Sequence, residues 1–521
     1  MKKYFSLKNL VYLTLGFLFS CSLLLKNEIN YDGSIPTQFI NEFHFSFTFF
    51  IKAFLISIPI IVITYISFKL LDNIRINNKA KIISNKKIFL ISFFGLFFMG
   101  ILHLITFYPG NIMIDTLYIF KSPMGMSAQH PLFYILIITL PFKIFAKIFN
   151  NLNLALFFTC TLQLTIASVI ISFIITWFNK KFKNIKLTVI LMLYFIILPI
   201  VTNYNTTLVK DSAFCLSMIC LVPIIYEIIN SEGNWIKNNR NILTFIIFTS
   251  LLCLIRNNGI YIVILLLLLF ILIYKKYFKQ WLTILAIVPI ISFIPQLFSN
   301  KQLFQEKVGI PLQQISYVIH TDGKISKKNK EYLNKIYNYN LYKENYNPYL
   351  VDTIKWDINF NREYLNNNSS KFIKTWFETL PNNFEGYIKS YILCTYGNWS
   401  FNKFYDTQSI FLGVDGVDTN EPKLFPEIKS KNTFLNFMKP FYNKTTKYLS
   451  GGVCFWILIY ISCYMIYKKK YKLLLLTIPL YGTWLSLMVA TPFSMAFRYM
   501  SPFIYLLPLI VLITLIKKPL V

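Results

Sequence analysis

Residues 242–255 read ILTFIIFTSLLCLI and residues 260–274 read IYIVILLLLLFILIY; the tetrapeptide RNNG (256–259) separates them, and two lysines follow at 275–276. A helix needs about 20 mainly apolar residues to cross the hydrocarbon core of a bilayer. Because both runs approach this length and only four residues join them, they predict two neighbouring membrane-spanning helices with Arg256 in the turn between them.

The composition of the whole chain extends this interpretation to a polytopic membrane protein. Of the 521 residues 55% are hydrophobic and only 14% are charged, whereas soluble domains carry about 25% charged residues. An ordinary cytosolic enzyme, a coiled coil and a disordered chain are therefore excluded. The net charge of +30 is distributed in short clusters between apolar runs, which is typical of cytoplasmic loops and does not indicate a nucleic-acid partner.

Twelve apolar runs are predicted to cross the membrane, which makes the predicted fold class all-α, a polytopic transmembrane helical bundle. The runs are residues 9–25, 46–71, 88–107, 153–178, 187–203, 212–230, 242–256, 260–274, 281–299, 453–467, 473–490 and 499–516. The sequence predicts an N-terminal bundle (1–299), a mainly helical extracytoplasmic domain (300–450) and a C-terminal group of three spans (451–521).

A thirteenth apolar stretch, residues 131–149, either crosses the membrane or lies in its outer interface. If it crossed, Lys180 to Lys186 and every later basic cluster would change sides. If it lies in the interface, the basic clusters all fall on one side, and Lys/Arg asymmetry in short loops is the main determinant of orientation. We therefore predict an outer interfacial helix and a multi-pass cell-membrane protein with both termini in the cytoplasm.

The predicted topology gathers several ionisable and polar residues at the outer ends of the spans. Ionisable groups near the membrane core are costly and are therefore functional candidates. Asp115 is the predicted catalytic residue, because a carboxylate can take a proton from an acceptor hydroxyl, while cations can hold a departing phosphate. The predicted substrate-binding residues are His130, Lys210, Asp211, Arg256, Asn257, Asn258, Arg498 and Tyr499.

Each of these residues also has a purely structural interpretation. Asp115 is equally explained as a solvated loop carboxylate, and Asp211 as a helix cap or as the partner of Lys210 in a local ion pair. Arg256 and Arg498 are alternatively anchors whose charged ends reach the membrane interface. The joint pattern, and not any single residue, therefore carries the functional hypothesis.

The motifs Tyr108-Pro109-Gly110, His130-Pro131, Lys210-Asp211, Arg256-Asn257-Asn258-Gly259 and Arg498-Tyr499 resemble those of a poorly characterised polytopic family of low-GC Gram-positive bacteria, which is labelled a domain of unknown function. Gly309 to Gln314 and Leu380-Pro381-Asn382-Asn383 are similar to that family's extracellular signatures. At greater distance the layout is similar to GT-C glycosyltransferases, which carry an acidic residue in the first outer loop.

The GT-C resemblance implies a donor sugar on a polyprenyl phosphate and an acceptor that is an envelope glycan or glycolipid, with membrane lipids around the bundle. It implies that Asp115 is the acid of the first loop, and it leaves a divalent metal open as a cofactor, although the sequence shows no metal-ligand spacing. The rival hypotheses are a transporter or flippase of lipid-linked saccharides, a polymerase or ligase that uses diphosphate donors, and a non-catalytic scaffold or receptor.

Overall fold

The computed structural model describes residues 7–29, 34–73, 83–401, 413–414, 418, 423–426, 436, 440, 450–490 and 493–516. These residues form helices almost throughout, with a single sheet of two short strands. The predicted all-α polytopic fold is confirmed at this level.

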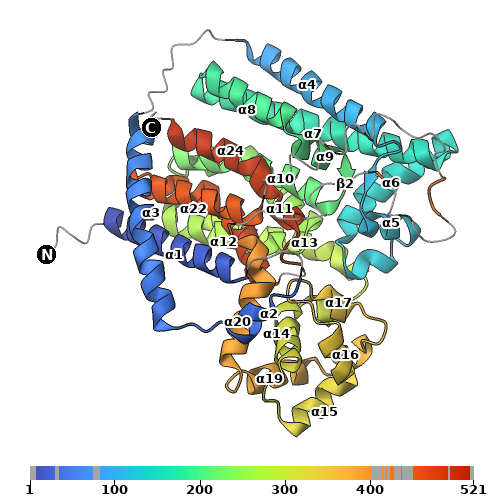
Figure 1. Ribbon diagram of the computed structural model, residues 1–521. Coiled ribbons are helices and arrows are strands. Elements are labelled where there is room, and N and C mark those ends of the chain that lie inside the picture. Colours follow the sequence, from blue (N-terminus) through green and yellow to red (C-terminus); the bar gives the residue numbers. More distant parts are fainter. Residues whose placement is uncertain are drawn as a thin grey trace.

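The larger part of the structure is a bundle of long helices (Figure 1). Its helices are α1 (Leu7–Ile29), α3 (Phe47–Asn73), α4 (Asn85–Thr106), α6 (Leu132–Phe149), α7 (Leu152–Phe182), α8 (Ile185–Ile197), α9 (Pro199–Thr206), α10 (Lys210–Asn230), α11 (Asn239–Ile255), α12 (Gly259–Ile273), α13 (Phe278–Phe293), α22 (Gly451–Tyr467), α23 (Ile478–Val489) and α24 (Pro502–Leu515). The short elements β1 (Asn111–Ile112), α5 (Ile114–Lys121), β2 (Thr207–Leu208) and η8 (Phe497–Met500) connect them.

Within the described residues, nine helical segments are long and apolar enough to cross a membrane. The pair α8–α9, bent by 61°, would add one more, and α11, α12 and α22 are apolar but shorter. Each predicted run therefore falls on a helix or on the bent pair, while the count of twelve spans stays a prediction. Because α6 is among the nine, length and composition leave both alternatives for residues 131–149 open.

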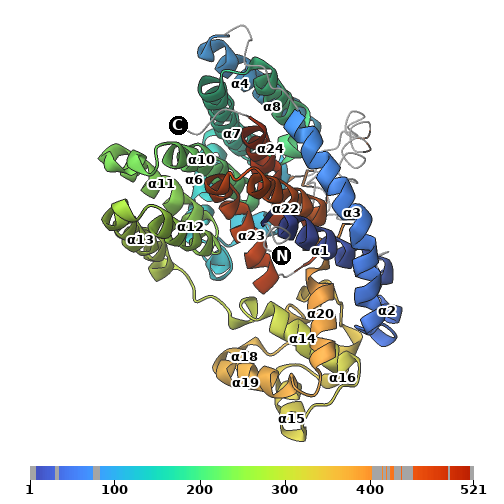
Figure 2. The same ribbon diagram turned by 90° about the vertical axis from the view of Figure 1, so that its left-hand side faces the viewer.

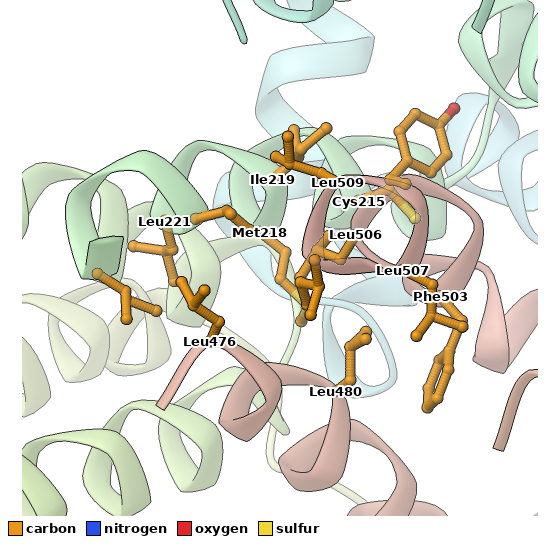
Figure 3. Close-up of a cluster of buried hydrophobic side chains, with 14 of the residues drawn as sticks. Cys215, Met218, Ile219, Leu221, Leu476, Leu480, Phe503, Leu506, Leu507 and Leu509 are labelled. Atoms are coloured by element: carbon orange, nitrogen blue, oxygen red, sulfur yellow. The ribbon is translucent and has the colours of Figure 1, made fainter. Parts of the chain in front are cut away.

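The interior of the bundle is built around α10, whose side chains are almost all buried. Figure 2 shows α10, α22 and α24 between α11–α13 on one side and α3 on the other. In the close-up of Figure 3, Cys215 and Met218 of α10 lie with Leu480 of α23 and Leu506 of α24 in one apolar cluster. Burial of this apolar surface is the main stabilising contribution to the packing of these helices.

The outer helices turn large apolar side chains away from the protein. On α3, Phe54 is 58% exposed and Ile63 is 64% exposed, and on α13, Ile290 is 63% exposed. Monomeric soluble proteins rarely carry contiguous apolar surface of this kind. These faces are therefore suited to contact with lipid chains.

Residues 304–398 form a smaller helical unit beside the bundle, at the bottom of Figure 1. Its helices are α14 (Gly309–His320), α15 (Lys327–Ile336), α16 (Tyr339–Glu344), α17 (Asp352–Lys355), α18 (Arg362–Asn367), α19 (Ser369–Thr379) and α20 (Phe384–Thr395). They enclose a core of their own that includes Leu312, Leu333 and Phe372. The short α2 (Thr37–Asn41), which follows α1, packs against this unit through Phe39 and Ile40. The predicted extracytoplasmic domain (300–450) also includes residues 402–449, and all but a few of these lie outside the described residues.

Candidate active site

Two distant loops are joined by a short parallel β-pairing. Asn111 of β1 pairs with Thr207 of β2, and Ile112 pairs with Leu208. In addition, the Thr116 hydroxyl donates a hydrogen bond to the Leu208 carbonyl. Since α5 starts two residues after β1 and α10 starts two residues after β2, the pairing fixes the beginnings of these two helices side by side.

Buried polar groups on either side hold this pairing in place. His103, which is 2% exposed on α4, has its Nδ1 3.3 Å from Asn111 Nδ2 and 3.0 Å from the Thr206 hydroxyl. From α7, the amide of Gln163 donates a hydrogen bond of 2.6 Å to the Thr207 carbonyl. Leaving a buried polar group without a partner costs about 1–3 kcal/mol, so these contacts restrict both loops to one arrangement.

The chain must also come very close to α7 just before β1. Gly110 has φ +149°, and a Cβ atom there would lie 2.7 Å from Cys160 Sγ. Only glycine meets both requirements without strain. The Tyr108-Pro109-Gly110 motif therefore lets the loop that carries Asp115 approach the bundle.

Asp115 lies in the first turn of α5 and faces Arg498 from η8. Its Oδ2 is 3.4 Å from Arg498 Nη1, and the two side chains are 30% and 12% exposed. Arg498 also donates a 2.7 Å hydrogen bond from Nη2 to the Tyr499 hydroxyl. Although burial alone would raise the pKa of Asp115, the charges of Arg498 and Lys210 hold that pKa below its ordinary value. Asp115 is therefore an ionised carboxylate with part of its surface open.

Lys210 and His130 form a second contact in the same cluster. Lys210 Nζ donates a 3.0 Å hydrogen bond to His130 Nδ1. Burial and the neighbouring Lys210 charge lower the pKa of His130 to about 3, so its ring is neutral at physiological pH. Its Nε2 is buried and has no hydrogen-bond partner among the described residues.

Asp211 and Arg256 form a third contact, an ion pair in the interior. Arg256 Nη1 lies 2.5 Å from Asp211 Oδ1, with the two side chains 11% and 0% exposed. The guanidinium also lies 5.5 Å from the centre of the Phe214 ring and 5.3 Å from that of Tyr499. The residue that caps α10 is Val209, so Asp211 does not cap this helix, and each of Lys210 and Asp211 hydrogen-bonds to a partner on another segment.

The two asparagines of the Arg256 turn behave differently from each other. Asn258 donates a 2.9 Å hydrogen bond to the Ser486 hydroxyl of α23 and thereby ties the turn to a neighbouring helix. Asn257 is exposed and makes no side-chain hydrogen bond to the described residues. Of the residues predicted from sequence, Asp115, His130, Lys210, Asp211, Arg256, Arg498 and Tyr499 are thus linked in one cluster, and Asn257 lies outside it.

The described residues do not fit a divalent metal at this position. Asp115 and Asp211 each face an arginine, and no three His, Cys, Asp or Glu side chains in the described ranges are close enough together to hold an ion.

His103 and Gln163, which hold the loops, were not predicted as site residues. A single histidine in an apolar helix gives no functional signal in the sequence.

Fold and site together define a polytopic helical protein with a buried charged cluster where several helices begin and end. Residues 37–519 match the sequence model of a family of unknown function, DUF6020, and the chain belongs to this family. The predicted membership in a family of unknown function is confirmed. Searches of curated proteins and of solved structures found no match.

The Asp211–Arg256 pair gives the first testable prediction, which concerns stability. Asp211→Ala and Arg256→Met should each destabilise the protein by about 3–5 kcal/mol, because each leaves one buried charge without its partner. The double variant should lose clearly less than the sum of the two, as unfolding midpoints in detergent would measure. Asp322→Asn, at an exposed pair with Lys343, is the control and should leave the midpoint unchanged; strictly additive losses would contradict the pairing.

Proposed function

We propose that the chain is an integral membrane glycosyltransferase of GT-C type, which moves a sugar from a polyprenyl-phosphate donor to an envelope glycan or glycolipid at the outer face of the membrane. The observation that carries the proposal is the partly open Asp115 carboxylate beside Arg498, with Lys210 and His130 next to it. This arrangement places a proton acceptor, the Asp115 carboxylate, beside cations that can hold a phosphate.

The position of basic residues supports an outward-facing site. α10 begins at the cluster, and near its other end Glu227 pairs with Lys181 at 2.7 Å. Beside the ends of α3 and α22, Lys468 pairs with Asp72 at 2.7 Å. Because Lys and Arg concentrate in cytoplasmic loops, this second end belongs on the cytoplasmic side in our proposal. The cluster around Asp115 then faces outward, with both chain termini inside.

The course of α6 supports the interfacial alternative for residues 131–149. Its first turn follows His130, which contacts Lys210. Its last residue, Phe149, is separated from the start of α7 by only two residues, and the far end of α7 carries Lys181. Both ends of α6 thus lie at the same end of the bundle as Lys210, so we assign it to the outer interface.

The charges of the cluster favour a donor with a single phosphate. Among its described residues the cluster holds three cations, Lys210, Arg256 and Arg498, and two carboxylates, Asp115 and Asp211. One positive charge is left over, and a sugar linked to polyprenyl phosphate carries one negative charge. Since Arg256 is held by Asp211 and by two aromatic rings, we assign the phosphate to Lys210 and Arg498, and give Arg256 a positioning role.

The proposed reaction is an inverting displacement in which charge and protons balance. The acceptor hydroxyl oxygen bonds to the anomeric carbon, and the bond from that carbon to the phosphate oxygen breaks. The phosphate leaves with the electron pair and is stabilised by Lys210 and Arg498, while Asp115 takes the hydroxyl proton. Donor phosphate also offsets the cations that lower the pKa of Asp115, which makes this carboxylate a stronger base once the donor is bound.

The principal alternative is a transporter of lipid-linked saccharides. It is favoured by the bent pair α8–α9, because broken helices near a binding site are common in transporters. A matched broken pair in the other half of the chain would be expected, and the described residues contain this one pair alone. An assay with protein reconstituted in vesicles distinguishes the transferase from the transporter. Movement of labelled donor across the bilayer without formation of a glycosylated product would identify the transporter.

Changing the proposed base tests the enzyme directly. Asp115→Asn should reduce transfer from a polyprenyl-phosphate sugar by about 10²-fold or more, since general-base catalysis contributes about 10²–10⁴-fold. Transfer of labelled sugar by purified protein, with Glu331→Gln of α15 as an exposed control carboxylate, provides the measurement. Turnover of the Asp115 variant close to that of the unaltered protein would remove this residue from the chemistry.

The pH dependence of transfer tests the link between donor and base. Activity should fall as the pH drops and Asp115 becomes protonated. The profile of kcat/KM reports the free enzyme and that of kcat the enzyme with donor bound. Because the phosphate offsets Arg498 and Lys210, the acid limb of kcat should lie at higher pH than that of kcat/KM. If the acid limbs of kcat and kcat/KM lay at the same pH, or in the opposite order, the proposed placement of the donor phosphate beside Asp115, Arg498 and Lys210 would be contradicted.

A further inference from the structure

A groove of about 410 Å³ lies outside the charged cluster, between the end of α2 with the residues that follow it and the helices α14 and α20. Its size is within the range of sites that bind small ligands, about 300–1,000 Å³. The Leu380-Pro381-Asn382-Asn383 motif forms one edge of the groove, with Asn382 and Asn383 in its lining. The proposed transfer chemistry gives this motif no role.

The lining of the groove contains exposed side-chain amides and an exposed aromatic ring. Asn41 and Asn382 are exposed, and their side chains make no hydrogen bond to the described residues. Each amide offers both donors and an acceptor. Beside them, Phe384 is 62% exposed. Sugar rings combine hydroxyl groups, which need both donors and acceptors, with apolar faces that stack on aromatic rings.

The charges of the lining disfavour a polyanion. The lining contains one lysine, Lys389, whose side chain is only 5% exposed. Its ammonium lies 3.5 Å from Glu385 and donates a hydrogen bond to the Ile40 carbonyl. Glu385 is 46% exposed and contacts His44 at 2.7 Å. A phosphate-rich polymer would therefore meet a carboxylate and no open lysine or arginine in this lining.

The groove is connected to the charged cluster through α20. The groove lies at the start of this helix, and beyond its end Gly397 packs so closely against the Ser494 carbonyl that a side chain there would clash with it. Ser494 itself donates a 3.0 Å hydrogen bond to the Tyr349 carbonyl. The segment that begins at Ser494 leads directly into η8 and Arg498, so packing and hydrogen-bond contacts link the groove's helix to the charged cluster.

We propose that this groove binds a neutral oligosaccharide. Its use as an acceptor subsite rests on the proposed function, whereas saccharide binding itself does not. The amides of Asn41 and Asn382 hydrogen-bond the sugar hydroxyls, the Phe384 ring covers an apolar sugar face, and Glu385 accepts from a further hydroxyl.

Binding of defined probes to the purified full-length protein tests the proposal without any donor. Cellotetraose, chitotetraose and maltotetraose serve as neutral probes, and a glycerol-phosphate oligomer as the anionic one, with affinities from calorimetry. At least one neutral probe should bind more tightly than the anionic one. Asn382→Ala and Phe384→Ala should each weaken that binding by about 10-fold, which corresponds to the loss of about one hydrogen bond or stacking contact.

Matched controls keep the result specific. Asn359→Ala and Phe377→Ala alter an exposed asparagine and a 57% exposed phenylalanine of the same helical unit that do not line the groove, and both should bind normally. No binding of any neutral probe, preference for the anionic probe, or equal losses in the controls would overturn the proposal. Normal binding without any transfer activity would reject the proposed function alone.

Discussion

The structure around the charged cluster depends on one short interaction, the parallel pairing of residues 111–112 with 207–208. Two residues beyond each strand a helix begins, and these two helix starts carry Asp115 and Lys210. The pairing would be weak alone, because two short strands bury little surface. It persists because His103 and Gln163, on two different bundle helices, satisfy the buried polar groups beside it.

The same reasoning explains how so many charges can be buried together. A buried charge without a partner costs several kcal/mol, and here Asp211 faces Arg256 while Asp115 faces Arg498. In our proposal the surplus cation is what lets the cluster bind an anion. Asp115 is more open than its partner Arg498, and in our proposal the acceptor hydroxyl meets this carboxylate while the phosphate lies against Arg498 and Lys210. The same arrangement that pairs the buried charges is thus the one on which the proposed chemistry rests.

The coarse architecture and several residues of the charged cluster could be predicted from the sequence, because their signals are local. Apolar runs mark the helices, and a charged residue such as Arg256 or Arg498 stands out against them. The rest depends on pairing between distant segments, which one sequence does not encode legibly. Residues 187–203 were predicted as a single span, yet the chain bends by 61° between α8 and α9. The pairing of Asp211 with Arg256 and the positioning role of His103 likewise required the structure.

The central claim is that distant loops bring their charged residues together on the outer side of the membrane. Labelling of single cysteines with a membrane-impermeant maleimide, in right-side-out vesicles, tests it most directly. Cysteines at positions 115 and 257 should react from the outside, and a cysteine at position 183, at the far end of α7, should react only after permeabilisation. Reaction of positions 115 and 257 from opposite sides would contradict the account.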